Sequence, residues 1–295
     1  MKNFKKAFSL IELSIVLLII GILIAGVTQS SRLIRQMKLA SARSLTEGSP
    51  VASIKGLVLW LETTGEKAFS QELEDATILP EGVKWLDRNP QSSFKADAAT
   101  PVTATAPTYV DSCINDLPCL SFTSANSTLM NVNQGLGVPE GVSVFIIIKT
   151  VADLPTTKAV ILNTNNTDGA GNGWFQISTY NSGEFSHASY DLSGTAFPSD
   201  IGTVARNTSY ILEVIQNISS NLILGINVNG AMSEASTQDF IERPNLNNGF
   251  NIGYHNSDNY LDGYISEIIV FDRAIKSEER VSVQRYLAKK WGIKI

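Results

Sequence analysis

Histidine, cysteine and positive charge are scarce in this chain. Its 295 residues include two histidines, His187 and His255, and two cysteines, Cys113 and Cys119. Neither histidine stands near a cysteine or a second histidine, so the usual ligand sets of a zinc site are absent. Residues 57–295 hold 15 Lys and Arg against 26 Asp and Glu. A net charge of −11 argues against nucleic-acid binding, whose affinity comes largely from clustered cations.

Sequence patterns of catalysis are also missing. The chain has no Gly-x-Ser-x-Gly elbow and no glycine-rich phosphate loop. A glycoside hydrolase needs two carboxylates that face one sugar bond. Glu72, Glu74 and Asp75 lie in a polar stretch without a strand pattern. Glu267 and Asp272 stand five residues apart on a predicted strand and therefore point to opposite faces. We expect no enzymatic activity.

Only one long apolar run occurs, and a single acid, Glu12, interrupts it. Phe8–Val27 comprises twenty residues, which as an α-helix span about 30 Å, the thickness of the hydrocarbon core of a bilayer. An unpaired carboxylate in such a segment costs on the order of 3 kcal/mol, so we expect Glu12 to have a partner. A secretory signal peptide has a shorter core and a small residue after it, whereas Ala7 precedes this run. The sequence predicts a transmembrane helix at 8–27.

The residues around Ala7 resemble the processing site of type IV prepilins and pseudopilins. The resemblance is carried by Lys5-Lys6-Ala7-Phe8-Ser9-Leu10-Ile11-Glu12-Leu13. It implies a basic leader at 1–7, cleavage by a prepilin peptidase between Ala7 and Phe8, and N-methylation of Phe8. Glu12 is then the fifth mature residue, about one helical turn from the new α-amino group. Its carboxylate can pair with the amine of Phe8 in a neighbouring subunit, which makes Phe8 and Glu12 the assembly residues.

The helix is predicted to continue beyond the membrane. Apolar residues recur at spacings of three and four from Leu33 to Ala40, and Gly48-Ser49-Pro50 supplies the stop. We therefore predict a pilin-like helix at 8–48 and a linker at 49–56.

Residues 57–295 have the pattern of strands joined by turns. Val142–Lys149 and Tyr210–Gln216 are β-branched runs typical of buried strands. Asn229-Gly230 follows another such run and indicates a hairpin turn. Further strands are expected at 173–179, 222–228, 249–254 and 263–271. Many strands with few helices predict an all-β jelly-roll sandwich, built as one domain over 57–295.

The two ends of this region resemble laminin-G-like domains of the concanavalin A type. The opening Lys55-Gly56-Leu57-Val58-Leu59-Trp60-Leu61 and the closing stretches 261–274 and 277–292 carry the resemblance. It implies the jelly-roll fold and identifies no ligand.

A short C-terminal helix is predicted to cap the sandwich. Ser277 is expected to be its N-cap, and Lys289 and Lys290 are expected near the negative end of the helix dipole. Core packing is expected for the residues on one face, Val283, Tyr286, Leu287 and Trp291.

Cys113 and Cys119 bracket the turn-forming stretch Ile114–Pro118. In an exported compartment the simplest interpretation is a local disulfide, and a free-thiol pair is the alternative.

Two polar loops, 163–174 and 255–260, are the candidates for ligand binding. Planar rings and amide groups hold sugars, and oxygen-rich loops can also bind calcium. Each loop can equally be a solvated connection between strands. The candidate residues are Asn166, Asp168, Asn172, Trp174, Asn256, Asp258 and Tyr260.

Together these features predict a minor pilin or pseudopilin that assembles through its helix and displays a sandwich acting as a glycan-binding adhesin. One alternative is a type II secretion pseudopilin whose domain contacts other subunits or cargo, and a second is a surface-tethered glycan-active enzyme. The expected location is the bacterial inner membrane, with a single pass and a periplasmic domain, followed by a pilus or pseudopilus. The expected partners are other pilin or pseudopilin subunits, a prepilin peptidase, and glycans or cell surfaces. No cofactor is expected, with calcium the one considered.

Overall fold

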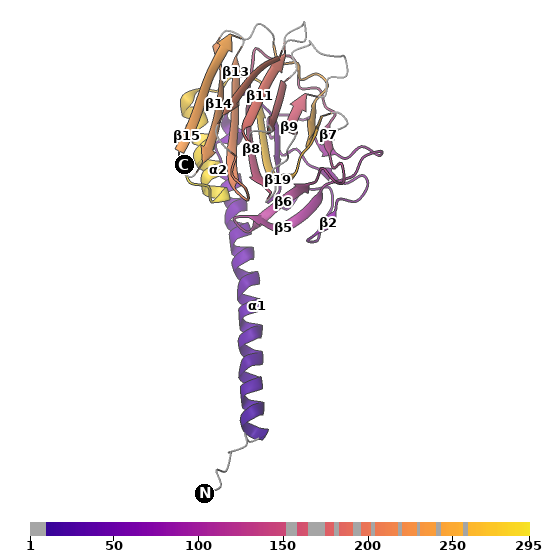
Figure 1. The fold of residues 1–295 in the computed structure, drawn as a ribbon, viewed down its shortest axis with the longest axis vertical. Helices are drawn as coiled ribbons and strands as arrows, with labels where there is room; N and C mark the ends of the chain where they lie inside the picture. Colours follow the sequence, from indigo (N-terminus) through magenta and orange to yellow (C-terminus); the bar gives the residue numbers. More distant parts are fainter. Residues whose placement is uncertain are drawn as a thin grey trace.

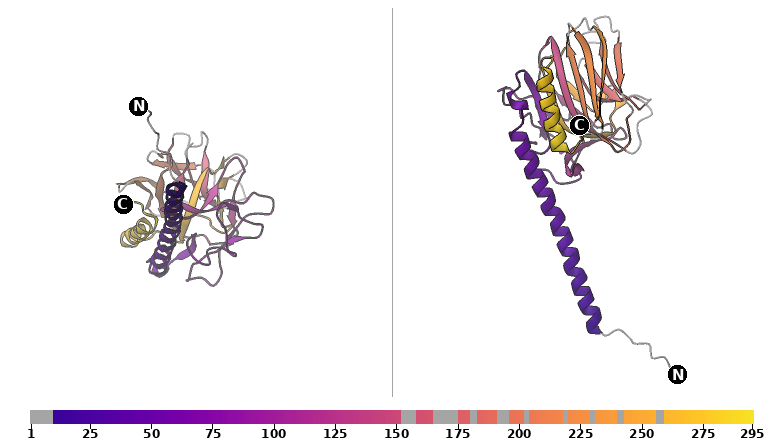
Figure 2. Two further views of the ribbon diagram at one scale, coloured as in Figure 1. Left: turned by 90° about the horizontal axis from the view of Figure 1, so that it is seen from below. Right: turned by 90° about the vertical axis from the view of Figure 1, so that its left-hand side faces the viewer.

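A single long helix projects from a β-sandwich. The computed structural model describes residues 10–151, 158–164, 175–179, 183–190, 196–201, 204–217, 220–228, 231–239, 243–255 and 259–295. Helix α1 (Leu10–Glu47) extends from the sandwich, and helix α2 (Ser277–Trp291) lies against the sandwich beside the end of α1 (Figures 1 and 2). This arrangement confirms the predicted order of an N-terminal helix, a β-sandwich and a short C-terminal helix.

The first part of α1 is apolar and exposed. Every large apolar side chain described from Leu10 to Ile24 is between 45% and 86% exposed. Within the residues that the structure describes, no helix is both long and apolar enough to span a membrane. The membrane span predicted at 8–27 begins outside the described residues and stays a prediction.

Two antiparallel sheets make up the sandwich. In the described residues, sheet A has the order β15-β14-β13-β8-β19-β6-β5-β2, with β1 paired to β19, and sheet B has the order β12-β11-β10-β9-β16-β7-β4-β3. A small hairpin, β17–β18, forms a separate two-stranded sheet. The strands of sheet A are β1 (Leu57–Glu62), β2 (Thr77–Ile78), β5 (Thr108–Ile114), β6 (Leu117–Phe122), β8 (Gly141–Thr150), β13 (Ser209–Asn217), β14 (Ser220–Val228), β15 (Ala231–Asp239) and β19 (Gly263–Phe271). Those of sheet B are β3 (Lys84–Trp85), β4 (Ala98–Ala99), β7 (Met130–Val132), β9 (Ala159–Thr164), β10 (Phe175–Thr179), β11 (Phe185–Tyr190), β12 (Ala196–Ile201) and β16 (Phe250–Ile252). The hairpin strands are β17 (Tyr254–His255) and β18 (Asn259–Tyr260).

The central strands of sheet A are buried on both faces. In β8, Val144 and Ile146 belong to the core between the sheets, whereas Phe145 and Ile147 belong to a second core that includes α2. Successive side chains of a strand point to opposite faces, so a strand covered on both sides has a continuous apolar sequence. This explains the uninterrupted β-branched run that predicts the strand.

The residues between α1 and β1 are packed into the second core. The predicted linker at 49–56 contains a short 3₁₀ helix, η1 (Val51–Ser53). Val51 and Ile54 are 0% and 5% exposed, and they share the second core with Ala42 of α1. The end of α1 is therefore built into the domain and is not joined to it by a free tether.

Helix α2 differs from its prediction at the N-cap, and its last turn holds Lys289 and Lys290 as predicted. Its predicted apolar face is buried, but Lys276 is its N-cap, and Ser277 is its first helical residue. The Lys276 N–H donates to Glu279 Oε2 at 2.8 Å, so the carboxylate three residues later satisfies the backbone donor of the N-cap residue. Lys290 does not lie at the helix surface but is 2% exposed. Burial of this cation has consequences for the site described next.

Candidate functional site at the joint between helix and sandwich

The structure places one of the three predicted processing and assembly residues. Glu12 lies in the first described turn of α1, with an exposed side chain. Ala7 and Phe8 lie outside the described residues. The features that the structure does describe in detail lie at the other end of α1, in the region where α1, α2, β1 and β19 meet, which we call the joint.

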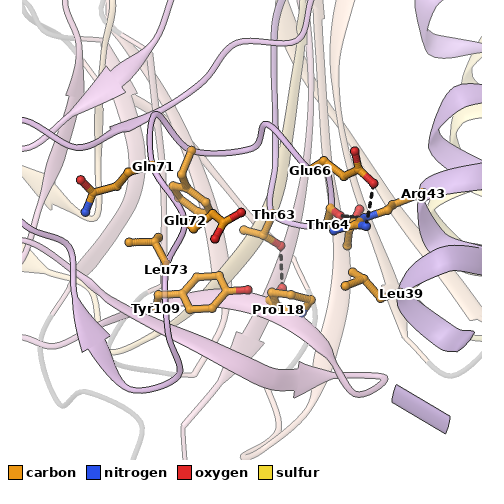
Figure 3. A pocket seen from close by; sticks show the side chains of 12 residues that line it. Leu39, Arg43, Thr63, Thr64, Glu66, Gln71, Glu72, Leu73, Tyr109 and Pro118 are labelled. Carbon is orange, nitrogen blue, oxygen red and sulfur yellow. Dashed lines mark hydrogen bonds and ion pairs between the residues drawn. The ribbon is translucent and has the colours of Figure 1, made fainter. Parts of the chain in front are cut away.

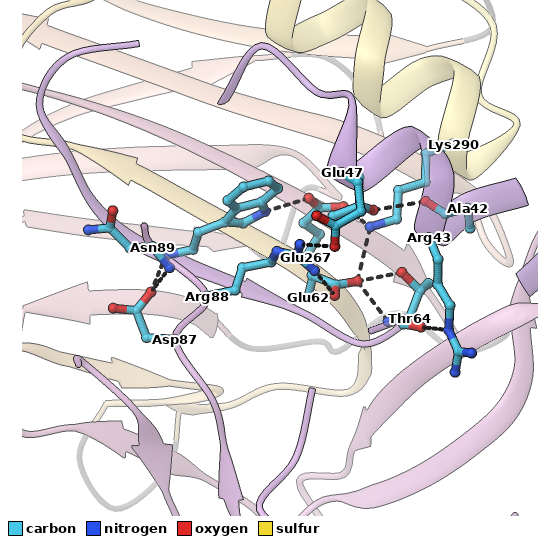
Figure 4. A network of polar contacts seen from close by, with 12 residues as sticks. Ala42, Arg43, Glu47, Glu62, Thr64, Asp87, Arg88, Asn89, Glu267 and Lys290 are labelled. Atoms are coloured by element: carbon cyan, nitrogen blue, oxygen red, sulfur yellow. Dashed lines mark hydrogen bonds and ion pairs between the residues drawn. The ribbon is translucent and has the colours of Figure 1, made fainter. Parts of the chain in front are cut away.

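A buried cation holds two carboxylates together at the joint (Figure 4). Lys290 Nζ of α2 lies 2.9 Å from Glu267 Oε2 of β19 and 3.1 Å from Glu62 Oε2 of β1. All three residues are at most 2% exposed. The indole N–H groups of Trp60 and Trp291 donate to Glu267 at 2.8 and 2.7 Å. Charges buried in this way are stable only when they are paired and hydrogen-bonded, and here each of them is.

Two further residues connect this cluster to α1. The Arg88 guanidinium lies 3.1 Å from Glu62 Oε1 and 2.7 Å from Glu47 Oε1 of α1. The Tyr286 hydroxyl lies 2.7 Å from Glu267 Oε1 and 3.3 Å from Thr46 Oγ1 of α1. Polar contacts therefore connect the end of α1 to both β1 and α2, in addition to the apolar packing of the second core.

The electrostatics of the joint favour the ionised form of Glu62. Burial raises the pKa of Glu62, but the charges of Lys290 and Arg88 and the hydrogen bonds of Thr64 outweigh it and lower this pKa to about 2. Burial, together with Glu267 and Glu62, raises the pKa of Tyr286 well above its ordinary value of 10. The Glu62 carboxylate thus stays charged and the Tyr286 hydroxyl stays a donor at neutral pH. Because these groups are enclosed and paired, they hold the elements together and are not exposed to a substrate.

An open pocket of about 440 Å³ lies beside the joint (Figure 3). Leu39 and Arg43 of α1 form one side of it, Tyr109 and Leu73 form the other, and Thr63 and Pro118 lie between (Figure 3). Arg43 donates to the Thr64 carbonyl at 2.8 Å, and its guanidinium lies 3.2 Å from Glu66. Burial, helped by Asp111, raises the pKa of Tyr109 to about 12. In the part of the chain that the structure describes, no group of three His, Cys, Asp or Glu residues is arranged to hold a metal ion.

The cysteines lie on the β5–β6 hairpin, which contacts α1 through ion pairs. Cys113 of β5 and Cys119 of β6 form a disulfide, with Cα atoms 5.9 Å apart, as the sequence predicts. The same hairpin carries two acids that pair with α1, Asp111 with Arg35 and Asp116 with Lys38. The hydrogen bond from Lys38 lowers the pKa of Asp116. Sequence reasoning did not identify either acid, because more than 70 residues separate each from its partner.

The predicted ligand loops are mostly outside the described residues. Asn166, Asp168, Asn172 and Trp174 lie in 165–174, and Asn256 and Asp258 lie in 256–258, none of which is described. Tyr260 is described and lies in β18, opposite Tyr254 of β17. The first loop begins after Thr164, the last residue of β9. The second loop follows β17, which comes after β16, and β16 runs antiparallel to β9, from Thr164 toward the first residues of β9. The two loops therefore start from opposite ends of β9.

Comparison with known proteins identifies the N-terminal segment and the fold of the sandwich. Residues 2–28 match the family model described as the prokaryotic N-terminal methylation motif, which confirms the type IV prepilin segment predicted at the N-terminus. No curated protein has a matching sequence. Similar solved structures include the botulinum neurotoxin serotype D binding domain, with a TM-score of 0.54 and 16% identity over 84% of this chain and 56% of that one. The serotype G binding domain has a TM-score of 0.54 and 12% identity over 79% of this chain and 51% of that one.

This chain spans little more than half the length of those binding domains. Similarity at so low an identity concerns the fold alone, and it agrees with the predicted jelly-roll sandwich. The chain therefore combines a type IV prepilin N-terminal segment with a β-sandwich of the kind found in these binding domains.

Proposed function

We propose that this protein is a minor pilin or pseudopilin, which assembles through α1 and presents its sandwich on a filament. The observation that carries the proposal is the methylation motif at 2–28, which includes the first part of α1, where the described large apolar side chains are exposed. Each square ångström of such surface costs about 25 cal/mol in water, so a chain with this helix needs an apolar environment. The bilayer supplies it before assembly, and neighbouring helices supply it afterwards.

Glu12 has a specific role in this mechanism. A prepilin peptidase cuts after Ala7, and the new α-amino group of Phe8 carries a positive charge at neutral pH. As the helix leaves the inner membrane for the filament, the Glu12 carboxylate pairs with the amine of a neighbouring subunit. Both charges are then neutralised in an apolar bundle, where an unpaired charge is expensive.

The joint supports a presenting role for the sandwich. Val51, Ile54 and Ala42 pack the end of α1 into the second core, and the ion pair of Arg88 with Glu47 adds a polar contact to α1. A domain fixed in this way keeps one orientation on its helix. We propose that the domain acts by binding and catalyses no reaction, because Glu62 and Glu267, the paired carboxylates of the joint, are both engaged by Lys290.

The assembly mechanism is tested by replacing Glu12 with Ala. The variant should insert in the membrane and be processed normally, and it should fail to enter filaments. Ser14→Ala, two residues away on the same exposed part of α1, is the matched control and should assemble. Membrane fractionation, the mass of the processed chain and immunoblots of sheared filaments give the three readouts. Normal incorporation of the Glu12 variant would contradict the pairing mechanism.

Glycan binding is the proposed task of the presented domain. Its support is the likeness of the fold to solved structures titled as binding domains. Full-length processed protein in detergent, applied to a glycan array with and without calcium, tests this. A pull-down from the same preparation separates the filament types, because exported cargo among the bound proteins favours the secretion pseudopilin, and pilin subunits alone favour the pilus.

A further inference from the structure

A pair of tyrosine rings lies on the β17–β18 hairpin, apart from the joint. Tyr254 and Tyr260 are cross-strand partners. Their ring centroids lie 4.9 Å apart, and the ring planes are tilted by 36°. Both residues are half-buried, so part of this aromatic surface faces solvent. Nothing in the joint or in the proposed assembly mechanism uses it.

The hairpin is held firmly on the sandwich. The Gly253 N–H donates to the Ile161 carbonyl of β9 at 2.9 Å, and the Leu261 N–H donates to the Gly253 carbonyl at 3.0 Å. Gly253 has a φ of +79°, and a Cβ added there would lie 2.5 Å from the Phe122 ring. Only glycine fits this close approach. The two rings are therefore presented by a backbone that is fixed before any ligand arrives, which lowers the entropic cost of binding.

Polar groups stand next to the rings. His255 and Asn259 are the neighbouring cross-strand pair of the same hairpin. Burial, followed by the charge of Lys158, lowers the pKa of His255 to about 4. The imidazole is therefore neutral at pH 7, where it has one donor and one acceptor nitrogen. Lys158 directly precedes β9 and adds a cation to this edge of an otherwise acidic domain.

This combination suits a carbohydrate. A pyranose ring has an apolar face of C–H groups that lies well against an aromatic ring, and a rim of hydroxyls that hydrogen-bonds to amides and imidazoles. We propose that Tyr254, His255, Asn259 and Tyr260 form a subsite for a pyranose ring, and that Lys158 favours a sugar bearing a carboxylate. This inference rests on the proposed binding function of the domain and names the residues and the ligand class for it.

The tyrosine pair also stabilises its hairpin, since aromatic pairs contribute about 0.5–1.5 kcal/mol. The test therefore needs readouts that separate stability from binding. Tyr254→Ala and Tyr260→Ala remove the ring, and Tyr254→Phe and Tyr260→Phe keep the ring without its hydroxyl. Tyr264→Ala is the matched control, because Tyr264 is also half-buried and lies near a cation, with Lys149 Nζ 5.8 Å from its ring.

Full-length processed protein in detergent is titrated with the glycans that it binds on an array of neutral and acidic sugars. Each Ala variant of the pair should weaken binding about tenfold, which corresponds to about 1.4 kcal/mol. The Phe variants and Tyr264→Ala should stay near the wild-type affinity, and Lys158→Ala should weaken acidic sugars selectively. Melting curves identify any variant that fails to fold.

A measurement on the unaltered protein guards against misfolded variants. Nitration by tetranitromethane, read by peptide mass spectrometry, should be slowed at Tyr254 and Tyr260 by bound glycan and unchanged at Tyr264. Glycan binding that survives in folded Ala variants, or nitration that the glycan does not slow, would overturn the subsite and leave glycan binding at another place. Failure of the wild type to bind any glycan would overturn the proposed binding function itself.

Discussion

Replacing Lys290 with Met should destabilise the sandwich by about 3–5 kcal/mol, the usual cost of breaking a buried ion pair by removing one partner. The variant leaves Glu62 and Glu267, which are 2% and 1% exposed, without the cation that lies between them. The pKa of Glu62 falls from 4.5 to about 2 and thus favours its charged form by about 3 kcal/mol, and Lys290 is the largest of the groups that lower this pKa. Small proteins are stable by only about 5–15 kcal/mol, so this loss is a large share.

Urea unfolding of the full-length protein in detergent, followed by tryptophan fluorescence, measures the effect. Trp60 and Trp291 both donate to Glu267, so their emission reports on the joint itself. Lys289→Met is the matched control, since Lys289 is the exposed neighbour on the same helix. Adding Glu62→Gln and Glu267→Gln to Lys290→Met should restore part of the stability, because the two carboxylates are then neutral.

The pH dependence gives a second readout. The folded pKa of Glu62 is depressed, so its contribution to stability is fully present above about pH 4.5 and is lost as the pH falls toward 2. Without Lys290 the opposing effect of burial gains weight, and the variant should lose less stability over the same range. Two results would refute the reasoning: a Lys290 variant no less stable than the Lys289 control, or identical acid sensitivity in wild type and variant.

Two further predictions concern the β5–β6 hairpin, which contacts α1. Changing Cys113 and Cys119 together to Ser should lower the free energy of unfolding by about 2 kcal/mol, because the bond closes a short loop; equal urea midpoints with and without reductant would contradict this. Changing Asp111 and Asp116 together to Asn should leave the melting temperature nearly unchanged, since exposed ion pairs contribute little. It should nevertheless broaden the distances measured between spin labels on α1 and on the sandwich, whereas Glu140→Gln, which breaks a distant exposed pair with Arg243, should not.

What could be predicted from the sequence follows from the range of the interactions. The prepilin segment is a local pattern, and the strands at 142–149 and 263–271 are continuous apolar runs. The segment and the strands can therefore be predicted from a few neighbouring residues. The hairpin turn at 229–230 was also inferred locally; β14 and β15 pair antiparallel on either side of it, although the turn itself lies outside the described residues. Glu62, Glu267 and Lys290 each look like ordinary surface charges, and 228 residues separate the first from the last. Lys290 in particular stands in the last turn of its helix, where an exposed cation usually interacts with the helix dipole. Only the packing of α2 on the sheet shows that Lys290 is buried.

The elements that form the joint are synthesised at different times. A chain is made from its N-terminus, so α1 and β1 exist long before β19 and α2, their partners at the far end of the sequence. The contact of α1 with Tyr286 of α2, and the ion pairs of Lys290 with Glu62 and Glu267, can form only when these later residues are in place. A product that ended before residue 263 would keep its prepilin segment and lack every partner that Glu62 has in β19 and α2. The buried ion pairs of the joint thus depend on residues that lie far along the chain from the prepilin segment.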